Sequence, residues 1–189
     1  MNKLVAILLI LITSSVLFSQ EKKVYTSLNV ALANIDSVFV LDLSKQKLES
    51  FPKEILQLKN LKKLVLKKNK IKEIPVELGK LKNLEYISIE KNKITTFPLA
   101  FCQLTELKTL VICRNPIINM PDCIQYLENL EYIDMWETEI ADIPSEISKL
   151  KKLKEIDLRG IAYNSRFQKR LFELLPNTKI HFDLPCNCD

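Results

Sequence analysis

The segment from Leu61 to Asn83 reads LKKLVLKKNKIKEIPVELGKLKN, and its pattern decides the fold. The same spacing of apolar residues, amide and proline recurs every 23 residues, with no residue inserted or lost between units. Self-similarity at such a fixed spacing indicates a solenoid, in which each unit buries its apolar side chains only against its neighbours. The units begin at Val38, Leu61, Leu84, Leu107, Leu130 and Leu153.

Each unit begins with a strand pattern. Counting from the first residue of a unit, positions four and six are apolar and alternate with solvent-facing residues, as at Leu64 and Leu66. This alternation predicts a short strand with one buried face. Position nine carries an amide in most units, and an amide there can bond the backbone where the chain leaves the strand. We therefore expect a ladder of stacked side chains at Gln46, Asn69, Asn92, Asn115 and Thr138.

Proline follows at position fifteen in all five complete units. Proline lacks an amide donor and biases the preceding residue toward extended geometry, which disfavours a long α-helix at this point. We expect instead a short helical turn or 3₁₀ segment, whose apolar residues at positions eighteen and twenty-one point inward. Parallel strands lie closer together than these bulkier turns, so we predict a stack that curves with its strands on the concave side. The prolines are Pro52, Pro75, Pro98, Pro121 and Pro144.

With these residues in register, the chain from Val38 to about Leu158 resembles the leucine-rich repeat family, and in particular its 23-residue class. The resemblance implies an α/β fold: a curved right-handed coil with a parallel β-sheet on the concave face and short helical or 3₁₀ turns on the convex face. It also implies an arc-shaped module that binds other macromolecules, usually proteins.

The two ends of a repeat stack need covers for their apolar faces. We expect residues 20–37 to form an N-terminal cap with a short helix that starts after Ser27. Residues 38–160 hold five full repeats and one partial repeat. Residues 161–189 then form a C-terminal cap and tail, with a helix from Ser165 that ends at Pro176 and a last strand from Lys179 to Phe182.

The first residues predict export. Lys3 precedes an apolar run that small polar residues follow, a pattern typical of a cleavable secretory signal over residues 1–19. The run is shorter than the roughly 18–20 residues of a membrane-spanning helix. We expect cleavage near Ser19 or Gln20 and a periplasmic or extracellular protein with no integral membrane segment afterwards. An uncleaved membrane anchor is the alternative.

Export permits disulfides, but an odd number of cysteines leaves at least one thiol unpaired within a single chain. Cys102 and Cys123 fall on the same outer side of adjacent units. We expect two buried thiols there, because their offset can exceed the ~7 Å limit between bridged α-carbons. Cys186 and Cys188 lie in a tail that lacks the four ligands of a structural zinc site. The tail offers an alternative role in cross-linking or self-association.

The charge is uneven along the repeats. Residues 38–106 carry 14 lysines and 8 acids, a net charge of +6, whereas residues 107–160 carry 7 basic residues and 10 acids, a net charge of −3. Position eight forms a basic row of Lys45, Lys68, Lys91 and Arg114. The row is either a solvated face or a site for an anionic polysaccharide or surface polymer. Nucleic acid is not an expected partner outside the cell.

Aromatic and acidic residues gather on the strand side of the later units. Trp136 is the only tryptophan, and the repeat places it outward. Exposed Trp, Tyr and Arg are the residue types enriched at protein-interface hot spots. We predict a protein-docking patch centred on Trp136, although surface aromatics that merely cover neighbouring strands are the alternative. The predicted patch comprises Tyr86, Arg114, Tyr132, Asp134, Trp136, Asp157 and Arg159.

Two carboxylates of this patch, Asp134 and Asp157, should lie side by side on neighbouring strands, where like charges repel. We expect Arg159 to compensate them, with a partner's cation or calcium as alternatives. Calcium would need six to eight oxygen ligands, which the sequence does not assemble. We therefore expect neither a metal nor a cofactor.

Catalysis is not expected either. The chain has one histidine, His181, and too few glycines for a phosphate-binding loop. Cys113 faces the strand side, but the repeat places no histidine where it could activate the thiol. The sequence therefore predicts a non-catalytic, exported binding module.

Overall fold

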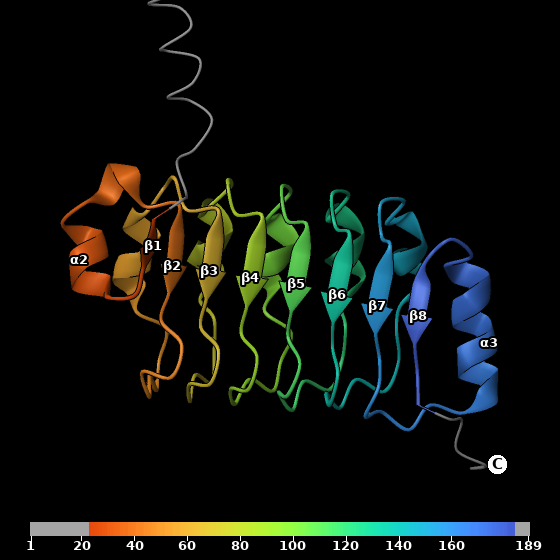
Figure 1. Cartoon of the computed structure of the whole chain (residues 1–189). Coiled ribbons are helices and arrows are strands. Elements are labelled where there is room, and N and C mark those ends of the chain that lie inside the picture. Colours follow the sequence, from red (N-terminus) through yellow and green to blue (C-terminus); the bar gives the residue numbers. More distant parts are fainter. Residues whose placement is uncertain (1–22, 184–189) are drawn as a thin grey trace, which may run out of the picture.

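The computed structural model describes residues 23–183, and in this part of the chain eight parallel strands form one open sheet in sequence order (Figure 1). Neighbouring strands pair with a displacement of one repeat, as in Leu41 with Leu64 and Leu64 with Ile87. The strands are β1 (Val24–Tyr25), β2 (Val40–Asp42), β3 (Lys63–Val65), β4 (Tyr86–Ser88), β5 (Thr109–Val111), β6 (Tyr132–Asp134), β7 (Glu155–Asp157) and β8 (Lys179–His181).

The return path of each coil is a 3₁₀ turn, as the prolines predicted. Each turn begins directly after a proline with extended backbone, for example Pro75 at φ −69° and ψ 147°. The turns lie behind the strands in the view of Figure 1. They are η2 (Lys53–Gln57), η3 (Val76–Lys80), η4 (Leu99–Gln103), η5 (Asp122–Tyr126) and η6 (Ser145–Lys149).

The core is a continuous column of apolar side chains between the strands and the 3₁₀ turns. In the second unit, Leu64, Leu66, Ile71, Leu78 and Leu81 are all 0% exposed, and the equivalent residues of other units repeat this pattern. Fully burying one such side chain stabilises the fold by about 1.5–3 kcal/mol. Because each unit packs only on its neighbours, stability accumulates along the stack rather than around one centre.

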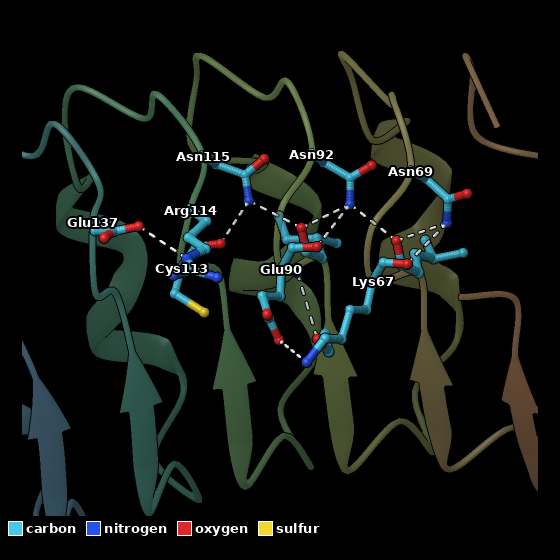
Figure 2. A network of polar contacts seen from close by, with 11 residues as sticks. Lys67, Asn69, Glu90, Asn92, Cys113, Arg114, Asn115 and Glu137 are labelled. Atoms are coloured by element: carbon cyan, nitrogen blue, oxygen red, sulfur yellow. Dashed lines mark hydrogen bonds and ion pairs between the residues drawn. The ribbon is translucent and has the colours of Figure 1, made fainter. Parts of the chain in front are cut away.

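A ladder of asparagine side chains ties the coils together where the chain leaves the strands (Figure 2). The Asn92 amide nitrogen donates to the carbonyl of Leu66 in the preceding unit at 2.9 Å and to that of Ile89 in its own unit at 2.8 Å. Its Oδ1 accepts the amide of Ile71 at 3.0 Å. Asn69 and Asn115 make the equivalent bonds.

The ladder stops in the later units. Position nine of the fifth unit is Thr138, whose hydroxyl is buried and has no hydrogen-bond partner among residues 23–183. In a second ladder, the backbone amides of Lys70 and Lys93 donate to backbone carbonyls of the preceding unit. This ladder is interrupted at Pro116, because proline has no amide proton. Regularity therefore breaks in the region where the patch was predicted.

Helices stand at both ends of the sheet (Figure 1). At the N-terminal end, α2 (Leu28–Leu32) and η1 (Ile35–Ser37) follow Ser27, which occupies the N-cap position but makes no side-chain capping bond. Strand β1 was not predicted, because two residues are too few to show a period. It buries Tyr25, whose hydroxyl lies 3.1 Å from the Oγ of Ser37.

At the C-terminal end, α3 (Ser165–Leu174) begins after Asn164, whose Oδ1 accepts the amide of Phe167 at 2.9 Å. The chain then adds β8 to the edge of the sheet. The expected helix and last strand are thus both present. Residues 1–22, with the predicted signal segment, and residues 184–189, with Cys186 and Cys188, lie outside the described residues.

The prediction of two buried thiols at Cys102 and Cys123 is wrong. The two residues form a disulfide between η4 and η5, with a Sγ–Sγ distance of 2.06 Å and a Cα–Cα distance of 5.6 Å. A 3₁₀ turn rises only about 2 Å per residue. The offset of two positions between the cysteines is therefore too small to separate their backbones.

Within residues 23–183, no helix has the length and apolar character that crossing a membrane requires.

Candidate functional site

The strand face consists of the outward side chains at positions three and five of each unit, which lie in β2–β7. It also includes the outward residues that directly follow each strand, at positions seven and eight. Most of these side chains reach the surface, but Ser88, Val111, Cys113 and Asp157 are only 2%, 8%, 2% and 6% exposed. Counting positions therefore identifies which side of the sheet a residue is on, but not whether it is accessible.

Cys113 illustrates the difference. The sequence placed it on the strand side as a displayed residue, whereas the structure buries it there. Burial raises the pKa of the Cys113 thiol far above its ordinary value, and the neighbouring Asp134 raises it further. The thiol is therefore protonated at neutral pH and unsuited to act as a nucleophile.

The basic row has an unexpected backbone conformation. Lys45, Lys68, Lys91 and Arg114 have φ angles of 60°, 57°, 55° and 56°, in the left-handed region that non-glycine residues rarely adopt. This conformation turns the chain off each strand and projects the side chain at position eight outward. The three lysines are exposed, and none forms an ion pair with another of the residues 23–183.

Tyr86 is separate from the other predicted patch residues. It lies on β4, and Thr109 of β5 stands between it and Tyr132 of β6. The ammonium of Lys63 lies over the Tyr86 ring, 4.4 Å from its centroid. Nearby, Lys67 and Glu90 form an ion pair at 2.6 Å (Figure 2). The structure thus pairs Tyr86 with lysine neighbours in the basic half of the sheet.

Trp136 and Arg114 are brought together. The Arg114 guanidinium lies over the Trp136 ring, 4.1 Å from its centroid, and its Nε donates to the Oε2 of Glu137 at 2.9 Å. Figure 2 shows the Arg114–Glu137 contact between neighbouring coils. Trp136 remains half-buried. An indole fixed in this way would lose little side-chain entropy on binding, which favours interface contacts.

The two adjacent carboxylates have opposite environments. Asp134 and Asp157 pair in register on β6 and β7, as predicted. Arg159 donates from Nε to Oδ1 of Asp157 at 3.0 Å and from Nη2 to Oδ2 at 2.6 Å. Burial acts to raise the pKa of Asp157, but the hydrogen bonds from Arg159 outweigh it and the pKa is lowered.

Asp134 lacks such compensation. Its Oδ1 accepts the backbone amide of Trp136 at 3.1 Å. Burial raises the pKa of Asp134 above its ordinary value, and Asp157 adds to the rise, while the bond from the Trp136 amide and one from the Cys113 thiol oppose it. The expected compensation by Arg159 is therefore confirmed for one carboxylate only.

Tyr132 completes the later part of the strand face. It is half-buried, and burial together with the neighbouring Asp134 raises its pKa to about 12. Its hydroxyl is therefore a proton donor at neutral pH. The adjacent Glu155 on β7 is bound by His181, with Nε2 and Oε1 2.7 Å apart, and lies 3.9 Å from the ammonium of Lys179.

One charged network was not predicted, although its signal was in the sequence. From Lys62 onward, the residues at position two alternate between positive and negative charge. The carboxylate oxygens of Glu85 lie 2.8 Å from the ammonium groups of both Lys62 and Lys108. Lys154 and Glu131 continue the series. Hydrogen bonds from the Lys108 and Lys62 side chains lower the pKa of Glu85 to about 2. The network joins neighbouring coils and leaves the strand face unaffected.

Known proteins provide an independent view of this geometry. In a leucine-rich repeat protein of Leptospira interrogans, the similar region covers 72% of this chain and 41% of that protein, with 33% identity and a TM-score of 0.63. Internalin C2 of Listeria monocytogenes is 25% identical over 80% of this chain and 64% of its own, with a TM-score of 0.66.

A third structure shares the fold. It is the leucine-rich repeat ectodomain of the plant membrane receptor kinase GASSHO1/SCHENGEN3 from Arabidopsis thaliana, in complex with CASPARIAN STRIP INTEGRITY FACTOR 2. The similarity is 24% identity over 84% of this chain and 19% of that chain, with a TM-score of 0.68. This chain thus spans less than two thirds of the length of each of the three structures. A comparison with curated proteins found no match.

The family comparison agrees with the coils, the asparagine ladder and the 3₁₀ turns. The family described as "Leucine-rich repeat region" matches residues 12–181, which is most of the sequence. The chain belongs to the leucine-rich repeat family.

Proposed function

We propose that this protein is an exported, non-catalytic binding module that engages a protein partner through the strand face of β5–β7. The observation that carries the proposal is the position of Trp136. The only tryptophan of the chain lies outside the core, half-exposed and stacked on Arg114. Large aromatic and arginine side chains held in this way are typical of interface hot spots.

The family and the chemistry of the strand face support a binding role. Leucine-rich repeats are typical protein-binding modules, and one of the similar structures was solved in complex with a partner. On this chain, the buried Cys113 thiol holds its proton, and His181 is bound to Glu155 on a different strand. These groups give the strand face no nucleophile and base pair of the kind that covalent catalysis needs.

Two features support export. The disulfide between Cys102 and Cys123 is of a kind that persists in oxidising compartments. The signal pattern over residues 1–19 predicts the route there.

The test is partner capture with a double substitution, Trp136→Ala with Tyr132→Ala. Immobilised protein is incubated with a cell-envelope extract of the source organism, and retained proteins are quantified by mass spectrometry. We expect at least one protein to be retained by the native chain and lost by the double variant. Both residues are only partly buried, so the circular dichroism spectrum should not change.

The matched control is Tyr126→Ala. Tyr126 is also an aromatic residue and is 59% exposed, but it lies on η5, behind the sheet. This variant should retain the same partner as the native chain. Retention that is equal for all three proteins would show that Tyr132 and Trp136 do not bind it.

A second candidate function rests on the lysines at position eight. Lys45, Lys68 and Lys91 are exposed and stand one coil apart, at about the 4.8 Å spacing of neighbouring strands. Such a row would suit an anionic polysaccharide or surface polymer. Binding of this kind would weaken steeply with salt and with replacement of the three lysines by Gln, whereas Trp136→Ala would not affect it.

A further inference from the structure

In the sequence, Asp134 stands between two partly exposed aromatic residues, Tyr132 on β6 and Trp136 just after this strand. Tyr132 and Asp134 occupy alternate positions of β6, so their side chains project from the same face of the strand. Trp136 lies in the turn that follows this strand. The donors to Asp134 are neutral: the Trp136 amide, at 3.1 Å from Oδ1, and the Cys113 thiol. Among residues 23–183, no lysine, arginine or histidine lies within ion-pair distance of this carboxylate.

The neighbouring cations are bound elsewhere. Arg159 contacts both carboxylate oxygens of Asp157. Arg114 stacks on Trp136 and contacts Glu137. Asp134 is therefore a partly buried negative charge without a positive partner, and such a charge is unfavourable in a folded protein.

We infer that the partner places a lysine or arginine side chain against Asp134, between Tyr132 and Trp136. The inference rests on the proposed function and specifies the chemistry of the partner. A carboxylate would form a charge-assisted hydrogen bond with the incoming cation, and the flanking rings would attract it through their π faces.

Two observations favour a cation over an apolar or acidic group. The molecule already stacks a guanidinium on the Trp136 ring through Arg114, so this ring accepts such a contact. The surrounding residues 107–160 carry a net charge of −3, which would favour approach of a basic segment. An acidic segment would instead meet the repulsion of Asp134.

The molecule offers a direct readout, because Trp136 is its only tryptophan. The probe is the peptide tri-arginine amide, titrated into the native protein while the tryptophan fluorescence is recorded. We expect a saturable change that increased salt weakens. The uncharged tri-citrulline amide, which has nearly the same shape, should produce no saturable change.

The decisive variant is Asp134→Asn, which keeps the shape and the acceptor for the Trp136 amide while it removes the charge. We expect its affinity for tri-arginine amide to fall at least tenfold. The matched control is Asp42→Asn. Asp42 occupies the same repeat position and accepts the Ser44 amide at 2.9 Å, but its neighbours along the strand are Val40 and Ser44 instead of aromatic residues. This control should bind the probe like the native protein.

The result that would overturn the inference is equal binding of tri-arginine amide by Asp134→Asn and the native chain, or no saturable binding by the native chain. Capture from the envelope extract separates this failure from that of the proposed function. If Trp136→Ala with Tyr132→Ala loses a partner that Asp134→Asn retains, the docking surface stands and the basic contact is refuted. If neither variant loses a partner, the docking surface itself is refuted.

Discussion

The two halves of the strand face differ in both regularity and charge. Across β2–β4, the asparagine ladder is continuous, exposed lysines occupy the left-handed positions, and lysines contact Tyr86 and Glu90. Across β5–β7, the ladder ends at Thr138, and the left-handed position of the fifth unit holds Glu137. Aromatic and acidic side chains take the place of lysines there.

We propose that the first half serves mainly to stabilise the stack and that the second half carries recognition. Natural proteins often depart from their local sequence rules at functional sites and compensate for the loss elsewhere. Within the described part of the chain, the departures are a buried hydroxyl without a partner, a proline in a backbone ladder and a carboxylate without a cation. All three lie in the fifth unit or immediately before it.

The largest expected effect concerns the bond that joins the two halves. Replacing Cys102 and Cys123 with Ser removes a disulfide that spans a sequence separation of 21 residues. Closing a loop of this size stabilises a fold by roughly 3 kcal/mol. We expect a loss of this order in urea denaturation. Dithiothreitol should lower the stability of the native chain by a similar amount and leave the double variant unchanged.

The next largest effect tests whether the asparagine ladder stabilises the stack more than the threonine at which it ends. Asn115→Ala removes three donated bonds and one accepted bond around a residue that is 2% exposed. Leaving buried backbone groups unsatisfied should cost about 2–3 kcal/mol. Thr138→Ala removes a hydroxyl that makes no bond in the described region and should cost less than about 0.5 kcal/mol. Equal losses in urea denaturation would contradict this contrast.

The smallest effect is the change of stability with pH, which should have opposite signs for Glu85 and Asp134. The pKa of Glu85 is lowered from 4.5 to about 2, so its contribution to stability is present above pH 4.5 and is lost as the pH falls toward 2. Glu85→Gln should therefore destabilise the fold at pH 7, by less than about 1 kcal/mol because the ion pairs are partly exposed. The difference from the native chain should shrink as the pH is lowered.

Asp134 should behave in the opposite way. Its pKa is raised, so the charged form destabilises the fold at pH 7, and protonation relieves this cost as the pH falls through the raised value. Asp134→Asn should increase stability at pH 7 while it weakens binding of a basic peptide. Urea denaturation of both variants at pH 7 and pH 3 tests the two signs together. A loss of stability in Asp134→Asn at pH 7 would contradict the proposed lack of compensation.

Much of the fold could be predicted because a solenoid repeats its information. The strands, the buried column, the asparagine ladder and the 3₁₀ turns all follow from spacing, and each is seen several times in the sequence. Single features were harder. Strand β1 covers only Val24–Tyr25, and the Cys102–Cys123 bond depends on how two turns pack.

The candidate site was predictable in outline only. Counting placed Trp136, Tyr132, Asp134 and Asp157 on one face and anticipated the contact between Asp157 and Arg159. It could not show that Cys113 is covered or that Tyr86 pairs with Lys63. Burial and pairing depend on the sizes of side chains on adjacent strands, which periodicity does not encode.

The Cys102–Cys123 bond also bears on how the chain matures. The two sulfur atoms meet only when the third and fourth coils have stacked in the correct order, because they belong to different 3₁₀ turns. Oxidation therefore links coils that packing has already aligned. Misfolded chains whose two thiols do not come together cannot form this bond. In an oxidising compartment, this single covalent bond would act as a checkpoint for quality before the protein meets its partner.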